Sequence, residues 1–172
     1  IDKFLFFLII LLFITGLFFS LVSTSLLVSD KLNTNDYAFF FKHLSFVLLG
    51  IIIIFLLSVI NEKKLLRISP VIFLFSLISL ILVPLIGVEV NSAKRWIDLY
   101  FLPRFQPIEL VKPFLIILLS LILSSEKYSN IYLKYLFSFL ITLFVALLLV
   151  AQPDIGQTLL IFFSWSVLIF IS

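Results

Sequence analysis

The sequence has no cysteine and no methionine, and it contains one histidine and four glycines among 172 residues. Without cysteine there is no disulfide framework, no thiolate nucleophile and no cysteine-based metal site. A single histidine argues against a zinc cluster. Four scattered glycines leave no glycine-rich loop that would hold a phosphate. We therefore identify no metal site and no cofactor in this sequence, and it does not decide whether a divalent cation is required.

Charge is also scarce. Charged residues make up 12% of the chain and hydrophobic residues 63%, and the mean hydropathy is +1.34. Soluble domains are about half apolar and one quarter charged, so this composition lies outside their range. The net charge of +3 comes from residues scattered over short segments, which excludes the basic stripe of a nucleic-acid-binding protein. We predict that membrane lipid surrounds most of the chain.

Long runs without charge predict the membrane spans. Five runs contain no Asp, Glu, Lys or Arg, and a sixth carries only Glu109 and Lys112 near its start. Each is close to the roughly 20 residues that a helix needs to cross the hydrocarbon layer. Backbone groups in lipid must be satisfied within their own element, so the runs should be helices. We predict an all-α polytopic membrane protein, a single membrane domain over residues 1–172, with helices at about 4–28, 39–60, 69–87, 107–125, 133–151 and 154–172.

The connections between these spans are short. Ser69 and Pro70 have the order of an N-cap followed by proline at the first helical position, which predicts a helix start there. Residues 87–106 form the longest and most polar connection. The chain starts at Ile1 and stops at Ser172 within an apolar run, and we expect it to be a piece of a longer protein.

Basic residues do not decide the orientation. With a cytoplasmic amino terminus, six Lys or Arg residues lie inside and five outside, so the positive-inside rule favours neither orientation. Three of the outer cations, among them Arg95, lie in the connection 91–104. They predict either a site for an anionic headgroup or pyrophosphate, or an interfacial loop with Trp96 at headgroup level.

Glu109 and Lys112 are the strongest candidates for chemistry. They lie three residues apart on one helix, hence on the same face and within reach of an ion pair. Ionisable residues in a span usually face a protein interior or a watery cavity. The two alternatives are a structural ion pair near the headgroups and a polar cavity open to the outer leaflet.

The order Gln-Pro-acid occurs twice, at Gln106-Pro-Ile-Glu109 and at Gln152-Pro-Asp154. Proline suits the first turn of a helix, and an early carboxylate complements the positive end of the helix dipole. Both segments are therefore predicted helix starts on the same side of the membrane. A second interpretation adds Gln106, Asp154 and Gln157 to the lining of the cavity that contains Glu109.

Together these segments resemble the SEDS family (shape, elongation, division and sporulation proteins). The resemblance is carried by Ser92-Ala-Lys-Arg-Trp-Ile-Asp-Leu99, Phe105-Gln-Pro-Ile-Glu-Leu-Val-Lys112 and Ala151-Gln-Pro-Asp-Ile-Gly156, in the family's order. The sequence departs from the family pattern at Ser92, where the family has glycine, and at Ile108, where it has serine. Neither departure changes a charged position.

The resemblance implies a fold of about ten helices with a cytoplasmic amino terminus, of which this chain is roughly the first half. It implies a peptidoglycan glycosyltransferase that polymerises lipid II at the outer face of the bacterial cytoplasmic membrane, with a class B penicillin-binding protein as partner transpeptidase. The family's proposed catalytic Asp lies on a loop between helices 7 and 8, so no catalytic residue is assigned in this sequence.

Within the family, Val111-Lys-Pro113, Asp154-Ile-Gly-Gln-Thr158 and Phe39-Phe-Phe-Lys-His43 favour the FtsW-like division branch over the RodA-like elongation branch. This branch implies the division machinery as partner and the septum as location.

Our hypothesis is that Arg95 and Lys112 contact the substrate anion, Glu109 holds Lys112 in place, and Asp154 organises the cavity. The alternative function is a transporter or flippase for the same lipid-linked precursor, because a polar cavity with outer cations suits that as well. A third possibility is an inert membrane scaffold.

Overall fold

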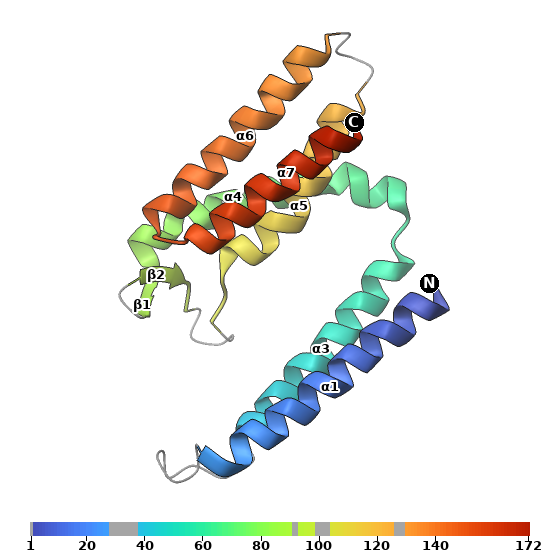
Figure 1. Cartoon of the computed structure of the whole chain (residues 1–172), viewed down its shortest axis with the longest axis vertical. Coiled ribbons are helices and arrows are strands. Elements are labelled where there is room, and N and C mark those ends of the chain that lie inside the picture. The colour runs from blue at the N-terminus through green and yellow to red at the C-terminus, as the bar shows by residue number, and fades with distance from the viewer. Residues whose placement is uncertain (1, 28–37, 91–92, 99–103, 126–129) are drawn as a thin grey trace. The chain divides into compact units, whose positions relative to one another are not determined.

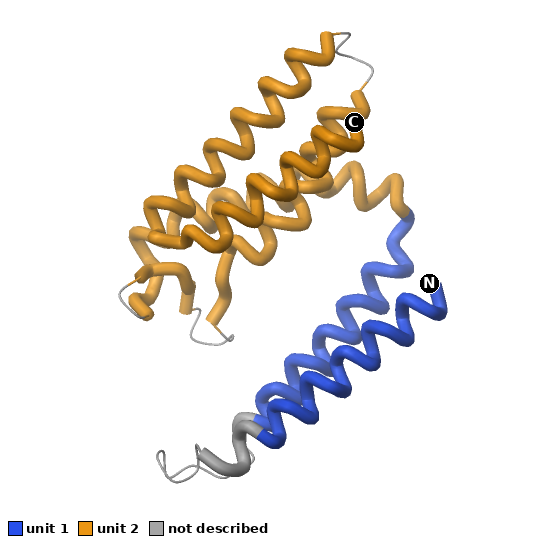
Figure 2. The backbone as a smooth tube through the Cα atoms, viewed as in Figure 1, with its two compact units in different colours: residues 1–61 blue, residues 62–172 orange. Residues whose placement is uncertain are grey.

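The computed structural model describes residues 2–27, 38–90, 93–98, 104–125 and 130–172. The chain divides into two compact units, residues 1–61 and residues 62–172, coloured separately in Figure 2.

The first unit is a pair of helices, α1 (Lys3–Leu27) and α3 (Ala38–Val59), which pack against each other. The side chain of Asp2 caps the start of α1, because its Oδ1 accepts a hydrogen bond from the backbone N–H of Phe4 at 2.8 Å. Both helices are apolar around their circumference, and large side chains such as Phe4 and Phe55 are exposed. A helix that is apolar on all sides and not covered by protein is suited to lipid.

The second unit contains, within the described residues, four helices and a short β-hairpin (Figure 1). In chain order its elements are α4 (Glu62–Ile86), β1 (Val88–Val90), β2 (Ala93–Trp96), α5 (Pro107–Leu123), α6 (Ile131–Ala151) and α7 (Ile155–Ile171). The helix α5 packs against α4, α6 and α7. It buries Ile108, Val111, Leu115 and Leu119, whose spacing of three and four places them on one helix face. This stripe is the centre of the core.

Polar side chains also join the helices of this unit. The indole Nε1–H of Trp165 in α7 donates to Ser138 Oγ in α6 at 3.1 Å, and its ring lies against Phe139. Lys134 Nζ, also in α6, donates to the carbonyl of Leu123 at the end of α5 at 3.1 Å. A cation at the carbonyl end of a helix is favourable, so this contact ties the first part of α6 to the end of α5.

The prediction of a helical polytopic membrane protein is confirmed. In the part of the chain that the structure describes, four helices are long and apolar enough to cross a membrane: Lys3–Val22, Phe40–Val59, Glu62–Ile86 and Ile131–Ala151. The helices α5 and α7 have 17 residues each, which is a length of ~26 Å at 1.5 Å per residue. That is the lower end of the range for a spanning helix.

The start predicted for the third helix, at residue 69, is wrong. The helix α4 begins at Glu62 and runs through Pro70 without a break. Proline leaves the carbonyl four residues earlier, that of Leu66, without its helical N–H. The hydroxyl of Ser69 donates to that carbonyl at 2.9 Å. Ser69 therefore repairs the interior of a helix, and does not cap its start.

The connection predicted over residues 87–106 contains regular structure that the sequence pattern did not predict. The strands β1 and β2 pair antiparallel, and Ile97 and Phe105 exchange two backbone hydrogen bonds of 2.8 and 3.0 Å. Figure 1 shows the hairpin at the same end of this unit as the start of α5 and the turn between α6 and α7. The hairpin therefore brings its side chains to the two predicted helix starts.

Gly87 permits the close approach of the hairpin to the end of α4. A Cβ atom built at this position would lie 2.3 Å from the carbonyl oxygen of Val83 and 3.3 Å from that of Trp96, both backbone atoms. We expect Gly87→Ala to destabilise the protein by about 1–3 kcal/mol, as overpacking does. The measurement is thermal unfolding in detergent. Gly16→Ala is the control, since no atom lies within 4 Å of its Cβ position, and an unchanged midpoint for Gly87→Ala would contradict the prediction.

Candidate functional site

Two helix starts form the framework of the site. Gln106 is the N-cap of α5, with Pro107 in the first turn and Glu109 as its early carboxylate. Asp154 is the N-cap of α7, and its Oδ1 accepts the backbone N–H of Gln157 at 3.4 Å. The segment 106–109 is thus a helix start, as predicted. In the second segment only Asp154 belongs to a helix start, because Gln152 is the C-cap of α6 and Pro153 lies before the N-cap of α7, outside the first turn. Two positive helix ends in one region make a favourable environment for negative charge.

Asp154 is the centre of a polar network. Its side chain is 12% exposed, and Oδ2 lies 3.8 Å from Nε of Arg95 in β2. The same oxygen lies 3.5 Å from Nε2 of Gln106, at the start of α5. The carboxylate thereby joins three elements: the hairpin, the start of α5 and the start of α7. Three of the predicted site residues are brought together here.

A second ion pair continues this network along α5. Lys112 Nζ lies 2.8 Å from the carboxylate of Glu109, the pairing predicted from their spacing. Gln157 connects the pair to α7, because its Nε2 donates to Glu109 Oε1 at 3.3 Å. Gln157 Oε1 is buried and accepts no hydrogen bond from the described residues. The Lys112 side chain is 19% exposed and that of Glu109 is 52% exposed, so the pair lies at the edge of the protein interior.

Arg95 is engaged by the turn between α6 and α7. Its Nε donates to the carbonyl of Gln152 at 3.2 Å, and its Nη2 donates to the carbonyl of Pro153. The last carbonyls of a helix have no partner within the helix, so an arginine that donates to them completes the end of α6. Nothing in the sequence indicates this contact, because its partners lie 57 and 58 residues away.

Gln152 is a structural member of the site that sequence reasoning did not select. Its side chain is buried, and Nε2 donates to the carbonyl of Leu80 in α4 at 3.1 Å. Pro84 lies four residues after Leu80 and cannot supply the helical N–H that this carbonyl needs. The signal in the sequence is Pro84, because a proline inside a span leaves a carbonyl unpaired and so requires a polar side chain from another element to donate to it.

Trp96 and Arg104 lie beside the network. Trp96 follows Arg95 in β2 and is half-buried, and successive residues of a strand point to opposite faces. The described contacts do not bring its ring to Asp154. Arg104 pairs with Asp98, with Nε 3.3 Å from Oδ2. The network therefore contains Arg95, Gln106, Glu109, Lys112 and Asp154 of the six predicted residues, with Trp96 at its border.

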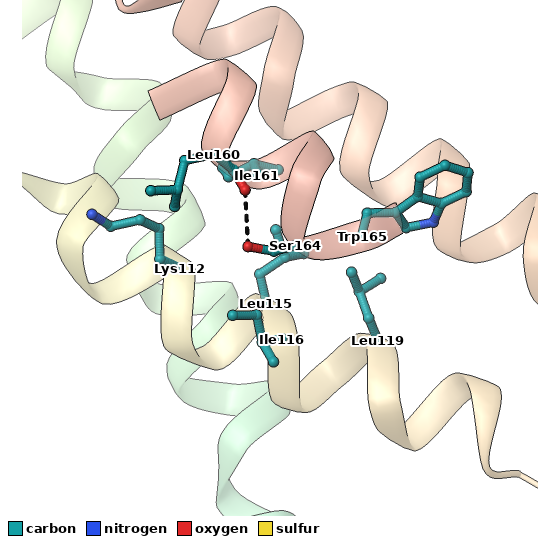
Figure 3. A pocket seen from close by; sticks show the side chains of 8 residues that line it. All are labelled: Lys112, Leu115, Ile116, Leu119, Leu160, Ile161, Ser164 and Trp165. Atoms are coloured by element: carbon teal, nitrogen blue, oxygen red, sulfur yellow. Dashed lines mark hydrogen bonds between the residues drawn. The ribbon is translucent and has the colours of Figure 1, made fainter. Parts of the chain in front are cut away.

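An apolar crevice between α5 and α7 extends from Lys112 (Figure 3). It is lined by Lys112, Leu115, Ile116 and Leu119 from α5 and by Leu160, Ile161, Ser164 and Trp165 from α7. The hydroxyl of Ser164 donates to the carbonyl of Leu160 at 2.8 Å and so offers no free donor to a ligand. A second hollow continues along the same helices, past Phe163 and Val167. One cation at the end of an apolar crevice suits an anionic head with a hydrocarbon tail.

Within the described part of the chain, no group of three or more His, Cys, Asp or Glu side chains is placed to hold a metal ion. The carboxylates of Glu109 and Asp154 are instead paired with cations and amides.

The sequence matches known proteins over nearly its whole length. The family model for cell cycle proteins of the FtsW, RodA and SpoVE type matches residues 2–172. A probable peptidoglycan glycosyltransferase FtsW of Haemophilus influenzae is 33% identical over 173 residues, covering 99% of this chain and 43% of the relative. The protein of the same name from Wigglesworthia glossinidia brevipalpis is 32% identical, covering 99% of this chain and 45% of the relative. The chain thus spans less than half the length of these relatives.

Solved structures are similar as well. The rod shape determining protein RodA of Thermus thermophilus superposes with a TM-score of 0.72 at 30% identity, over 91% of this chain and 52% of that one. A chain from a structure on the coordination of polymerization and crosslinking by a peptidoglycan synthase complex gives a TM-score of 0.71 at 30% identity, over 91% of this chain and 46% of the other.

Proposed function

Because this chain belongs to the FtsW, RodA and SpoVE family of cell cycle proteins, we propose that it is part of a peptidoglycan glycosyltransferase. The protein is a multi-pass membrane protein. In this proposal it joins lipid II units into glycan strands at the outer face of the cytoplasmic membrane. The observation that carries the proposal is the polar network at the starts of α5 and α7, which opens onto an apolar crevice.

The network supplies what a pyrophosphate leaving group needs. Transfer of a glycosyl unit from a lipid pyrophosphate releases negative charge, which fixed cations and helix amino termini stabilise. Lys112 is the proposed anion contact. Glu109 holds its ammonium at 2.8 Å, and Gln157 holds Glu109 from α7. Asp154 is the proposed organiser, because it ties the two helix starts to each other through Gln106.

The crevice and the hollow that continues it offer an apolar surface to a hydrocarbon chain. The walls of the crevice are the leucine and isoleucine side chains of α5 and α7, and Lys112 lies at one end (Figure 3). The crevice at Lys112 has a volume of about 10 Å³, and the hollow past Phe163 has about 240 Å³. We therefore propose that a polyprenyl tail lies along the hollow, in exchange with lipid tails. In line with the family resemblance, the proposal assigns the general base to none of the residues described above.

The proposal extends to partner and location. Relatives named FtsW and a structural neighbour from a synthase complex that also crosslinks support a class B penicillin-binding protein as partner. We propose the bacterial inner membrane at the division septum as its location, supported by the relatives named FtsW. The proposed cytoplasmic amino terminus rests on the family resemblance alone.

The test is a polymerisation assay in a defined system. Purified full-length protein and its transpeptidase partner receive fluorescent lipid II with no other glycosyltransferase present. The expected result is a ladder of glycan polymer on a gel. Lipid II that crosses vesicle membranes without polymer formation would instead assign the protein to the transporters, and would refute the proposal.

A further inference from the structure

We propose that Arg95 is a positioning residue that fastens the β-hairpin to the turn between α6 and α7, and that it does not bind the substrate anion. This inference rests on the proposed function, because it assigns the residue a part in the same site. It replaces the sequence-based hypothesis that both Arg95 and Lys112 contact the substrate anion.

The guanidinium of Arg95 faces three oxygen atoms of the turn between α6 and α7. Nε and Nη2 donate to two successive carbonyls, and Nε also lies 3.8 Å from the Asp154 carboxylate. The planar guanidinium is suited to such a forked arrangement, and its charge lies at the negative end of α6. Arg95 faces one carboxylate and two carbonyls, whereas Lys112 faces one carboxylate and lies at the end of the apolar crevice, so these contacts favour Lys112 over Arg95 as the anion contact.

The turn is held from two sides. Arg95 holds it from the hairpin, and Gln152 holds it from α4 through the carbonyl that Pro84 leaves free. Within the turn, the N–H of Asp154 donates to the carbonyl of Leu149 at 2.9 Å, which closes the end of α6. The position of Asp154 is therefore set by contacts to three separate elements.

Displacement of the turn would reach Lys112 through a continuous series of contacts. Asp154 Oδ1 accepts the backbone N–H of Gln157, whose side chain donates to Glu109, which pairs with Lys112. Asp154 Oδ2 also faces Gln106 at the start of α5. Loss of Arg95 thus loosens the arrangement that orients the Lys112 ammonium, without removing any group that touches the substrate.

The two roles of Arg95 predict different responses to lysine. An anion contact that acts through charge alone is largely restored by Arg95→Lys, because the charge is kept. The positioning role is not restored by Arg95→Lys, because one ammonium cannot reproduce the forked contact to two carbonyls. We expect Arg95→Ala and Arg95→Lys each to lower polymer formation about tenfold or more. Lys94→Ala is the matched control on the same strand, since Lys94 is exposed and its charge has no partner among the described ion pairs. Wild-type activity in Arg95→Lys would overturn the inference.

Hydrogen–deuterium exchange gives a readout that does not depend on catalysis. In the full-length protein, both Arg95 variants should exchange the amides of residues 152 and 154–158 on the order of tenfold faster, because local opening becomes easier. Exchange in the middle of α5 and α6 should stay as in the wild type, which separates a loosened turn from a misfolded protein. Equal amide exchange rates for this turn in the Arg95 and Lys94 variants would contradict the positioning role of Arg95. If Arg95→Ala does not fold, Arg95→Lys carries the same test.

A double-mutant cycle decides whether Arg95 acts through Asp154. Residues that act through one another have non-additive effects. With Asp154→Asn already present, adding Arg95→Lys should lower activity by less than about twofold further. Multiplication of the two single effects would mean independent action and would overturn the inference. If the wild type forms no polymer, the proposed function fails, while the exchange experiment still decides whether Arg95 holds the turn.

Discussion

Replacing Lys112 by alanine is expected to abolish glycan polymer formation, with a fall in rate of at least about 100-fold, the effect typical of removing one preorganised group that stabilises developing charge. Lys112 Nζ pairs with Glu109 at 2.8 Å and lies at the edge of the interior, so its loss leaves the core of α5 intact. The variant should therefore keep the wild-type thermal midpoint. The gel assay with fluorescent lipid II measures the rate.

The control for Lys112→Ala is Lys64→Ala, which removes a lysine exposed near the start of α4. Polymer formation by Lys64→Ala should equal that of the wild type. Full activity of Lys112→Ala would refute the anion contact.

The structural alternative for this pair has its own test. Exchanging the two charges, with Glu109→Lys and Lys112→Glu together, preserves an i,i+3 ion pair on the same helix face. A purely structural pair would regain activity in the exchanged protein. An anion contact would not, because the cation then lies one turn away and a carboxylate occupies the crevice end. We expect the exchanged protein to be as inactive as Lys112→Ala.

Asp154→Asn is expected to lower polymer formation about tenfold or more while leaving the thermal midpoint nearly unchanged. Asparagine caps a helix as well as aspartate does, so the start of α7 is kept. The substitution removes the charge that faces Arg95 and Gln106 at 3.8 and 3.5 Å. Activity and thermal unfolding are measured on the same preparation.

Asp154→Ala separates the cap from the charge. The alanine variant loses the N-cap oxygen as well as the charge. Its free energy of unfolding should be lower than that of Asp154→Asn by about 1 kcal/mol, the usual contribution of an N-cap. Wild-type activity in Asp154→Asn, with loss only in Asp154→Ala, would mean that the residue serves the helix start alone.

Much of the fold follows from where charge is absent. Stretches without Asp, Glu, Lys or Arg locate the spans, because burial of ionised groups in hydrocarbon is costly. The start of α4 could not be located this way. Proline at residue 70 usually marks a helix start, but a serine hydroxyl one position earlier repairs the lost hydrogen bond, and the helix extends back to Glu62. The hairpin was not predicted because its strands have three and four residues, too short for a periodic pattern.

The site was predictable in its members and not in its connections. Spacing alone pairs Glu109 with Lys112, and capping rules place Gln106 and Asp154 at helix starts. The partners of Arg95 depend on how β2 meets the end of α6, which no local rule describes. From the sequence, an arginine without a neighbouring acid is predicted to bind an anion. In the structure, Arg95 donates to two backbone carbonyls.

The two prolines inside α4 have different consequences for how the protein assembles. The hydrogen bond lost at Pro70 is replaced by the neighbouring Ser69 as soon as the helix forms. The bond lost at Pro84 is replaced by Gln152, which the ribosome adds 72 residues after Leu80. At a synthesis rate of about 5–20 residues per second, the Leu80 carbonyl lacks its native hydrogen-bond donor for at least several seconds. An unpaired carbonyl is costly in lipid. Pairing of the Leu80 carbonyl with Gln152 therefore stabilises the docking of the α6–α7 turn onto α4, a helix that was inserted earlier.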